Sequence, residues 1–172
     1  MMLIVFRLVI AVALLLGLSY ALRKLQVIQR KHLKFFLLLG FFEPFLYFLG
    51  ECYGVNMISP VLASIMISII PLLMPVPAWF IFRERMSLVN FSGLIVSIVG
   101  VFVVIAGDPG SQSSSLAGIL LMLVAVFSAV GHSIFVRKLT VYYNSFTIVT
   151  FQNCFGLLYF IPVFMATGFH KF

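Results

Sequence analysis

Long runs of apolar residues, separated by short polar connections, dominate the chain. A helix needs about 20 apolar residues to span about 30 Å of hydrocarbon, and six stretches meet that length. A membrane β-strand would alternate apolar and polar residues over about ten positions, which these stretches do not do. The predicted spanning helices are Met1–Leu22, Phe35–Val55, Met57–Phe82, Leu88–Ala106, Leu116–Val136 and Ser145–Thr167.

The composition supports this pattern. Of the 172 residues, 63% are hydrophobic and 9% are charged, whereas about a quarter of a soluble domain is charged. Too few polar side chains remain to cover a surface in water, which excludes a cytosolic enzyme, a disulfide-stapled secreted domain and a disordered chain. The sequence therefore predicts an all-α, polytopic helical protein of the cell membrane, in contact with membrane lipid.

The net charge of +7 follows a topological pattern. Cytoplasmic loops of membrane proteins are rich in Lys and Arg, so we expect the three basic connections inside and both chain ends outside the cytosol. The charge is explained in this way, and no nucleic-acid partner is expected. Because Met1 stands directly in an apolar run with no basic leader, we also expect a further helix upstream. The basic connections carry Arg23, Lys24, Arg30, Lys31, Lys34, Arg83, Arg85, Arg137 and Lys138.

Two polar side chains lie deep in the predicted spans. Glu43 comes about eight residues after the cytoplasmic border, which is about 12 Å deep. An ionised carboxylate at mid-bilayer costs about 2.5–3.5 kcal/mol, so Glu43 is either a proton- or cation-linked substrate group or a protonated structural carboxyl. Asn153 has the same depth in the last span, and the two side chains form a mid-membrane polar cluster if both face inward.

Other polar groups accompany these two. Tyr47 follows Glu43 on one stripe of the second span, and Gln152 stands beside Asn153. His132 lies about five residues from the cytoplasmic end of the fifth span. A lone histidine at that position is either an interhelical hydrogen-bond partner or a proton carrier or ligand contact.

Arg7 lies about 9 Å inside the outer end of the first span, at a level that matches Glu51. We expect an ion pair between these two residues with a stabilising role. The alternatives are that Arg7 extends to the outer headgroups or that it binds an anionic group.

The third span carries prolines at Pro71, Pro75 and Pro77. Proline inside a helix removes a hydrogen bond and kinks the helix, which membrane helices tolerate when neighbours or serine hydroxyls satisfy the backbone. The sequence predicts a bent helix, which either lines a moving pathway or holds a static kink.

The fourth span carries glycines at seven-residue spacing, namely Gly93, Gly100 and Gly107. Positions seven residues apart drift only slightly around a helix, so these glycines form one groove. Small residues let membrane helices approach each other closely, and the groove is therefore predicted to be a packing surface.

No enzyme motif is present: the chain lacks HExxH, GxSxG and GxxxxGK[ST] sequences. The four acids are too scattered for a catalytic dyad or a metal cluster, and the two cysteines do not have CxxC spacing. We therefore expect no enzymatic activity, no cofactor and no metal.

The stretch Asn56–Ile105 resembles the EamA-type family of the drug/metabolite transporter superfamily. In that family a Ser/Ala-rich helix that ends near proline leads into a Gly-Glu-Arg-like turn, and a helix with two spaced glycines follows. Phe6-Arg7-Leu8 and Ser128–Leu139 resemble parts of two further family helices. Arg83 stands where the family usually has glycine. The matching residues are Ser59, Ala63, Pro71, Glu84, Arg85, Gly93 and Gly100.

The resemblance implies a fold and an activity. Family members usually have ten helices, arranged as two inverted five-helix repeats. On that template, residues 1–107 correspond to helices two to five of the first repeat, residues 108–115 to an external loop, and residues 116–172 to the start of the second repeat. The chain thus has six of ten helices, and its expected partners are a second copy of itself or the missing helices of a full-length transporter.

The implied function is outward transport of small organic metabolites such as amino acids by alternating access, with coupling to protons as one option. On this interpretation Glu43 is the charge-sensitive group. Asn153, Gln152, Tyr47 and His132 are cavity contacts for the small-molecule substrate, and the prolines of the third span form part of the moving wall. The alternative is a truncated or non-transporting membrane subunit that helps another chain assemble.

Overall fold

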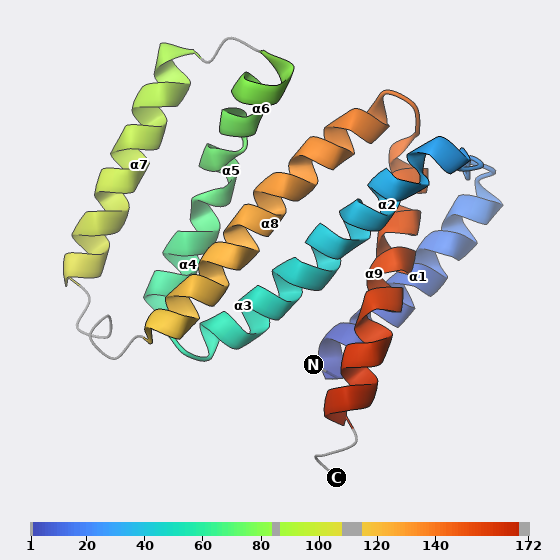
Figure 1. Cartoon of the computed structure of the whole chain (residues 1–172), viewed down its shortest axis with the longest axis horizontal. Coiled ribbons are helices and arrows are strands. Elements are labelled where there is room, and N and C mark those ends of the chain that lie inside the picture. The colour runs from blue at the N-terminus through green and yellow to red at the C-terminus, as the bar shows by residue number, and fades with distance from the viewer. Residues whose placement is uncertain (1, 84–86, 108–114, 169–172) are drawn as a thin grey trace. The chain divides into compact units, whose positions relative to one another are not determined.

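The computed structural model describes the backbone of residues 2–83, 87–107 and 115–168, and the elements in these residues are helical (Figure 1). The expected Glu84–Arg85 turn and residues 108–114 of the expected external loop lie outside the described residues. Two short elements, η1 and η2, are a 3-10 helix and a π-helix. The elements are α1 (Met2–Ala21), η1 (Arg30–His32), α2 (Leu33–Gly40), η2 (Phe41–Leu46), α3 (Tyr47–Val55), α4 (Pro60–Ser68), α5 (Ile70–Leu73), α6 (Pro75–Phe82), α7 (Leu88–Gly107), α8 (Leu116–Thr140) and α9 (Ser145–Gly168).

Five helical stretches among the described residues are long and apolar enough to cross a membrane. They coincide with five of the six spans that the apolar runs predict. The remaining predicted span, the fourth, is also helical, as the 20-residue α7, and the apolar part identified within it is Phe91–Gly100. The predicted fold class of an all-α, polytopic membrane protein is confirmed.

The second predicted span is not the single regular α-helix that its apolar run suggested. The helical path begins earlier, at η1, and is interrupted inside η2 by Glu43, whose backbone is extended (φ −140°, ψ 123°). Proline has no N–H and cannot continue the hydrogen-bond ladder, so Pro44 leaves the Gly40 carbonyl without its usual helical donor. The expectation of a continuous helix overlooked Pro44.

The third predicted span is also divided. It begins at Pro60, where the Ser59 hydroxyl accepts a hydrogen bond from the Leu62 N–H (3.2 Å) and so caps the helix. The ladder is interrupted at Ile69 and again at Met74, but both residues keep right-handed helical dihedral angles. The two interruptions lie beside Pro71 and Pro75, which provide no N–H groups.

Serine side chains satisfy part of the backbone in this span. The Ser64 hydroxyl donates to the Pro60 carbonyl (2.8 Å) and the Ser68 hydroxyl donates to the Ser64 carbonyl (2.7 Å). Such bonds to the carbonyl four residues earlier commonly bend helices. The proline-rich span therefore combines missing backbone donors at Pro71 and Pro75 with extra serine bonds one to two turns earlier in the chain.

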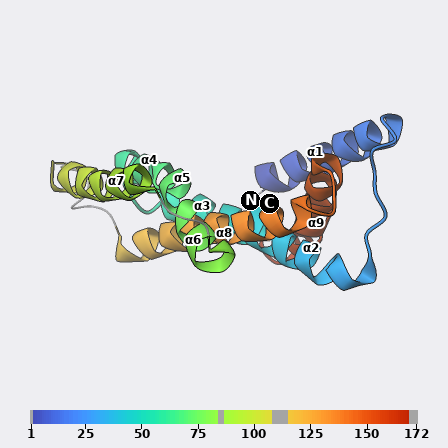
Figure 2. The same ribbon diagram turned by 90° about the horizontal axis from the view of Figure 1, so that it is seen from above.

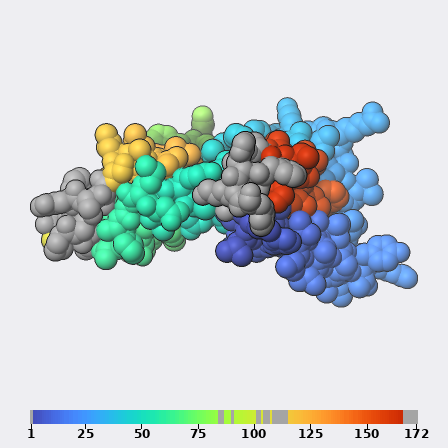
Figure 3. Space-filling view, turned by 90° about the horizontal axis from the view of Figure 1, so that it is seen from below, coloured from blue at the N-terminus to red at the C-terminus, as the bar shows by residue number. Residues whose placement is uncertain are grey.

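The chain divides into two compact units. The first comprises Met1–Phe48 and Phe135–Phe172, and the second comprises Leu49–Ile134. In the first unit α1, α2 and η2 all pack against α9. Figures 1 and 2 show α1 running beside α9, and the space-filling view shows the atoms of these two helices side by side in dark blue and red (Figure 3).

Glycines allow the closest approach within the first unit. A Cβ atom built at Gly40 would lie 2.7 Å from Phe155 Cβ and 3.0 Å from the Gly156 nitrogen. A Cβ built at Gly156 would overlap the ring of Pro44. The broken turn of η2 therefore sits directly on α9, because neither glycine has a side chain to separate them.

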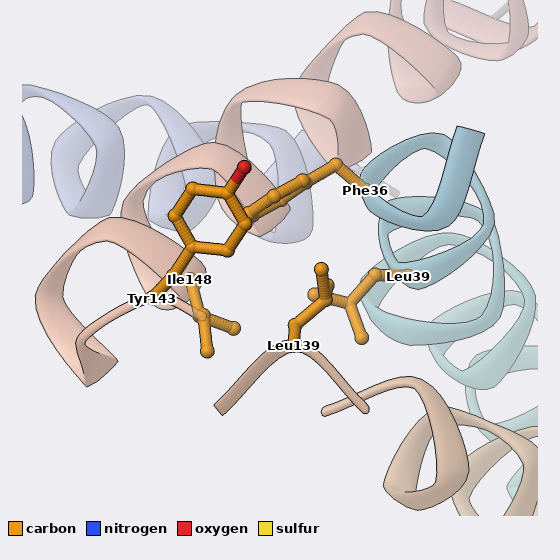
Figure 4. Close-up of a cluster of buried hydrophobic side chains, with 5 residues drawn as sticks. All are labelled: Phe36, Leu39, Leu139, Tyr143 and Ile148. Carbon is orange, nitrogen blue, oxygen red and sulfur yellow. The ribbon is translucent and has the colours of Figure 1, made fainter. Parts of the chain in front are cut away.

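An apolar cluster packs near the start of α2, in the first unit. It joins α2, the end of α8 and the start of α9, and its side chains are almost completely buried (Figure 4). The ring of Phe36 meets Tyr143 edge-on, with centroids 5.3 Å apart, a geometry that aromatic pairs favour. The cluster consists of Phe36, Leu39, Leu139, Tyr143 and Ile148.

In the second unit α3 lies against α8 through three further glycines. A Cβ at Gly50 would lie 2.6 Å from the Leu121 carbonyl oxygen, and one at Gly54 would lie 2.7 Å from Met122 Cγ. Gly118 on α8 is equally close to Met57. Gly50 and Gly54 form a small-xxx-small pair, which allows close packing of membrane helices. The segments α4 and α5 pack against α7.

We predict that G156A destabilises the protein, whereas G17A does not. The added methyl at position 156 would meet the Pro44 ring, and overpacking of this kind typically costs about 1–3 kcal/mol. At Gly17 no heavy atom of the described residues lies within 4 Å of a built Cβ, so alanine should be neutral or stabilise α1 by up to about 1 kcal/mol. Thermal unfolding in detergent, followed by circular dichroism, measures both. Equal melting temperatures for the two variants would contradict the close contact.

Candidate functional site

Glu43 occupies the break in the membrane-spanning path that runs from Arg30 to Val55. Its extended backbone removes it from the helical periodicity of its neighbours, so it does not belong to a continuous helical stripe with Tyr47 as the sequence predicted. The residue is half-buried, and the peptide bond to Pro44 is cis. An acidic side chain is thus located where the helix of a membrane span is discontinuous.

The break faces the turn of α9 that carries the two predicted amides. A Cβ at Gly40 would lie 3.1 Å from the Gln152 carbonyl oxygen, and Pro44 contacts Gly156. Gln152 is 9% exposed. Asn153 is half-buried, and its Nδ2 donates to the Val149 carbonyl (2.8 Å). The helical turns that carry Glu43, Gln152 and Asn153 therefore lie at one level of the first unit.

Two threonines on α9 form hydrogen bonds with α1 and with the connection that follows it. The Thr150 hydroxyl shares a buried hydrogen bond with the Ser19 hydroxyl of α1 (3.1 Å). The Thr147 hydroxyl accepts from the Gln26 N–H (3.0 Å) and donates to the Lys24 carbonyl (3.3 Å). These bonds hold α1 and the connection after it onto α9.

The remaining predicted cavity contacts belong to different units. Tyr47 is half-buried in the first unit, with its ring 5.5 Å from that of Phe48. His132 is half-buried in the second unit, and its Nε2 atom is buried. The role of both residues as substrate contacts remains a prediction. The alternative role of His132 as an interhelical hydrogen-bond partner also remains a prediction.

Arg7 has an aromatic contact. Its guanidinium carbon lies 4.2 Å from the centroid of the Phe48 ring, a cation–π contact within the first unit. Glu51, the expected ion-pair partner, belongs to the second unit. The Arg7–Glu51 pair remains a prediction, and the contact with Phe48 shows how the cation is accommodated beside an apolar helix.

The glycines of α7 have open surroundings. For Gly93, Gly100 and Gly107, no heavy atom of the described part of the chain lies within 4 Å of a built Cβ. Their packing role therefore remains a prediction that would require a helix from elsewhere. The close glycine contacts occur instead at positions 40, 50, 54, 118 and 156.

Several residues that shape the site were missed by the sequence reasoning. Pro44 carried a readable signal, since proline inside a helical pattern marks a break. Ser19, His32 and Tyr143 gave no signal, because their partners are more than 100 positions away in the sequence.

The chemistry open to this site is the binding of protons, cations or polar small molecules. Within the described residues no group of three or more His, Cys, Asp or Glu side chains is placed to hold a metal ion. Both cysteines, Cys52 and Cys154, are free.

The long apolar helices and the polar groups within them define a multi-pass helical membrane protein. Residues 1–106 match the model of the EamA-like transporter family. Because this match covers more than half of the chain, the chain belongs to that family. It is a family of membrane transporters and not of enzymes.

Curated relatives are similar over most of the chain. It is 27% identical over 169 residues to the "Uncharacterized transporter YetK" of Bacillus subtilis (strain 168), and the aligned region covers 95% of the chain and 51% of the relative. It is 27% identical over 160 residues to the "Uncharacterized transporter YdfC" of the same organism, covering 91% and 52%. The chain spans about half the length of these relatives. No solved structure matches it.

We predict that Ser19 and Thr150 are energetically coupled. S19A or T150V alone leaves one buried hydroxyl without its partner, which costs about 1–3 kcal/mol. The double variant removes both hydroxyls and should be less destabilised than the sum of the single variants. The free energies of unfolding of the unaltered chain, the two single variants and the double variant are measured in mixed micelles. The control is S92A, which changes an exposed serine of α7. Strictly additive effects would show that the two hydroxyls do not interact.

Proposed function

We propose that this chain takes part in moving small organic metabolites, such as amino acids, out of the cell across the plasma membrane by alternating access. Its membership of the EamA-like transporter family supports transport. The observation that carries the proposal is the half-buried Glu43 in the break of a membrane-spanning helix.

A broken helix suits this role. In many transporters, discontinuous helices near the bilayer midplane expose backbone groups that bind substrate or coupling ions. Irregular backbone at membrane depth is tolerated only where protein or a water-filled cavity covers it. Here α9 covers one side of the break through Gly156. The other side is available for substrate or water in our proposal.

Glu43 is the proposed charge-sensitive group. A carboxyl that binds either a proton or a cationic substrate, but not both, would couple the two movements. Gln152 and Asn153, one turn from the Pro44 contact on α9, are proposed to provide amide groups for a polar substrate. Tyr47 and His132 complete the proposed set of substrate contacts.

The division into family repeats is part of this proposal. Residues 1–107 would supply four helices of the first repeat and residues 116–172 the first two of the second. Because the chain spans about half the length of its curated relatives, we propose that a closed pathway requires a second copy or further helices. The same observation favours the alternative that the chain is a non-transporting subunit with an assembly role.

We predict that E43Q abolishes the dependence of transport on pH. The assay is efflux of a panel of radiolabelled amino acids from vesicles that contain the purified chain, at several external pH values. Coupling between two binding events typically changes affinity 5- to 150-fold. We therefore expect pH to shift the apparent affinity of the unaltered chain at least about fivefold, and that of E43Q not at all. E51Q removes the other acid of the same helical path and should retain the pH response.

One result would contradict the proposed role of Glu43, and a second would favour the alternative of a non-transporting subunit. Equal pH responses in the unaltered chain and E43Q would remove Glu43 from the coupling step. If the chain alone moves no amino acid, whereas a version extended by helices on both sides does, the non-transporting alternative holds for the chain alone. E43Q is then tested in the extended version.

A further inference from the structure

Two lysines from distant parts of the chain approach one aromatic ring. The Lys34 Nζ lies 5.5 Å from the centroid of Phe35 and the Lys138 Nζ lies 6.0 Å from it. Lys34 lies in the first turn of α2 and Lys138 in the last turn of α8. Both side chains are exposed, whereas Phe35 is half-buried against the apolar cluster. We call Lys34, Phe35 and Lys138 the basic–aromatic platform.

The charges of this platform are not balanced by neighbouring acids in the sequence. The two ammonium groups lie within about 12 Å of each other, close to the distance over which salt screens exposed charges. Neither residues 23–34 nor residues 135–144 contain an Asp or Glu, although together they hold seven Lys and Arg residues. Lys34 also lies at the positive end of the α2 dipole. These charges together favour an anion at the platform.

Hydrogen bonds fix the backbone on which the platform stands. The Tyr143 hydroxyl accepts from the Gln29 N–H (3.0 Å) and pairs with His32 Nδ1 (3.0 Å). The buried His32 ring lies 4.7 Å from the ring of Tyr142. In addition, the Asn144 N–H donates to Gln26 Oε1 (2.8 Å). The connection between α1 and α2 is thus held to the turn between α8 and α9.

The platform lies at the border of the membrane-spanning segments. Spanning stretches begin at Arg30 and Ser145 and end at Thr140, so three of them meet the headgroup region here. Anionic phospholipids present phosphodiesters at this level, next to apolar chains. Lysines near such a surface each strengthen binding, and the Phe35 ring offers an apolar contact beside the two cations.

We propose that the basic–aromatic platform binds the phosphodiester headgroup of an anionic phospholipid. The two ammonium groups flank the phosphate from α2 and α8, and the lipid chains follow the apolar surface of the helices. Lipid bound there would hold the start of α2 to the end of α8. This site is separate from the turn that carries Glu43.

The test measures binding of phosphatidylglycerol to the full chain in detergent, with phosphatidylcholine and inorganic phosphate as comparison probes. We expect K34Q/K138Q to bind phosphatidylglycerol about 10- to 30-fold more weakly, and K34R/K138R to retain binding. R23Q/K24Q removes the same charge from the connection after α1, where Lys24 lies over a different ring, Phe146. If the platform is a specific site, this control should lose clearly less affinity than K34Q/K138Q does. Circular dichroism confirms that each variant is folded.

Three results would overturn the proposal. Equal losses in K34Q/K138Q and R23Q/K24Q would indicate a general attraction to a basic surface. Equal binding of phosphatidylcholine and phosphatidylglycerol by the unaltered chain would show no preference for an anionic headgroup. Inorganic phosphate that competes at equal concentration would show that the platform binds the anion without its lipid.

Discussion

The contact between the Pro44 ring and Gly156 is the interaction on which the first unit depends. Pro44 ends the regular hydrogen-bond ladder of its helix, and lipid cannot supply the missing partners. The break is therefore stable only where another part of the protein lies directly against it. A glycine on α9 allows this approach, and the close packing of Gly40 against Phe155 and Gly156 extends the contact by one turn.

The polar residues of the first unit fall into two groups, according to whether they lie near the helix ends or at the break. Near the ends of the helices, hydroxyl and amide groups are used to hold segments together, as in the Ser19–Thr150 and Tyr143–Gln29 hydrogen bonds. At the break, an acidic side chain stands where the backbone is irregular. Polar groups of the first kind stabilise the unit, and we propose that the second kind serves transport.

The sequence predicts what depends on local patterns. Apolar runs of spanning length located the helices, and the last one, predicted as Ser145–Thr167, is α9 at Ser145–Gly168. The same runs concealed the break at Glu43, because a single proline does not change the apolar pattern. Spacing also suggested a packing role for glycines of α7, whereas the observed close contacts use Gly50 and Gly54. Whether a glycine contacts another helix depends on tertiary packing, and the spacing of glycines within one helix does not reveal that packing.

Chemical labelling of Glu43 tests the account most directly. An apolar carbodiimide reacts with carboxyl groups in apolar surroundings, and mass spectrometry then distinguishes position 43 from position 51. If Glu43 binds the proton or the substrate, labelling should occur there, decrease at alkaline pH and decrease again when a transported amino acid is added. Labelling of Glu43 that is insensitive to both, or equal protection of Glu51, would contradict the account.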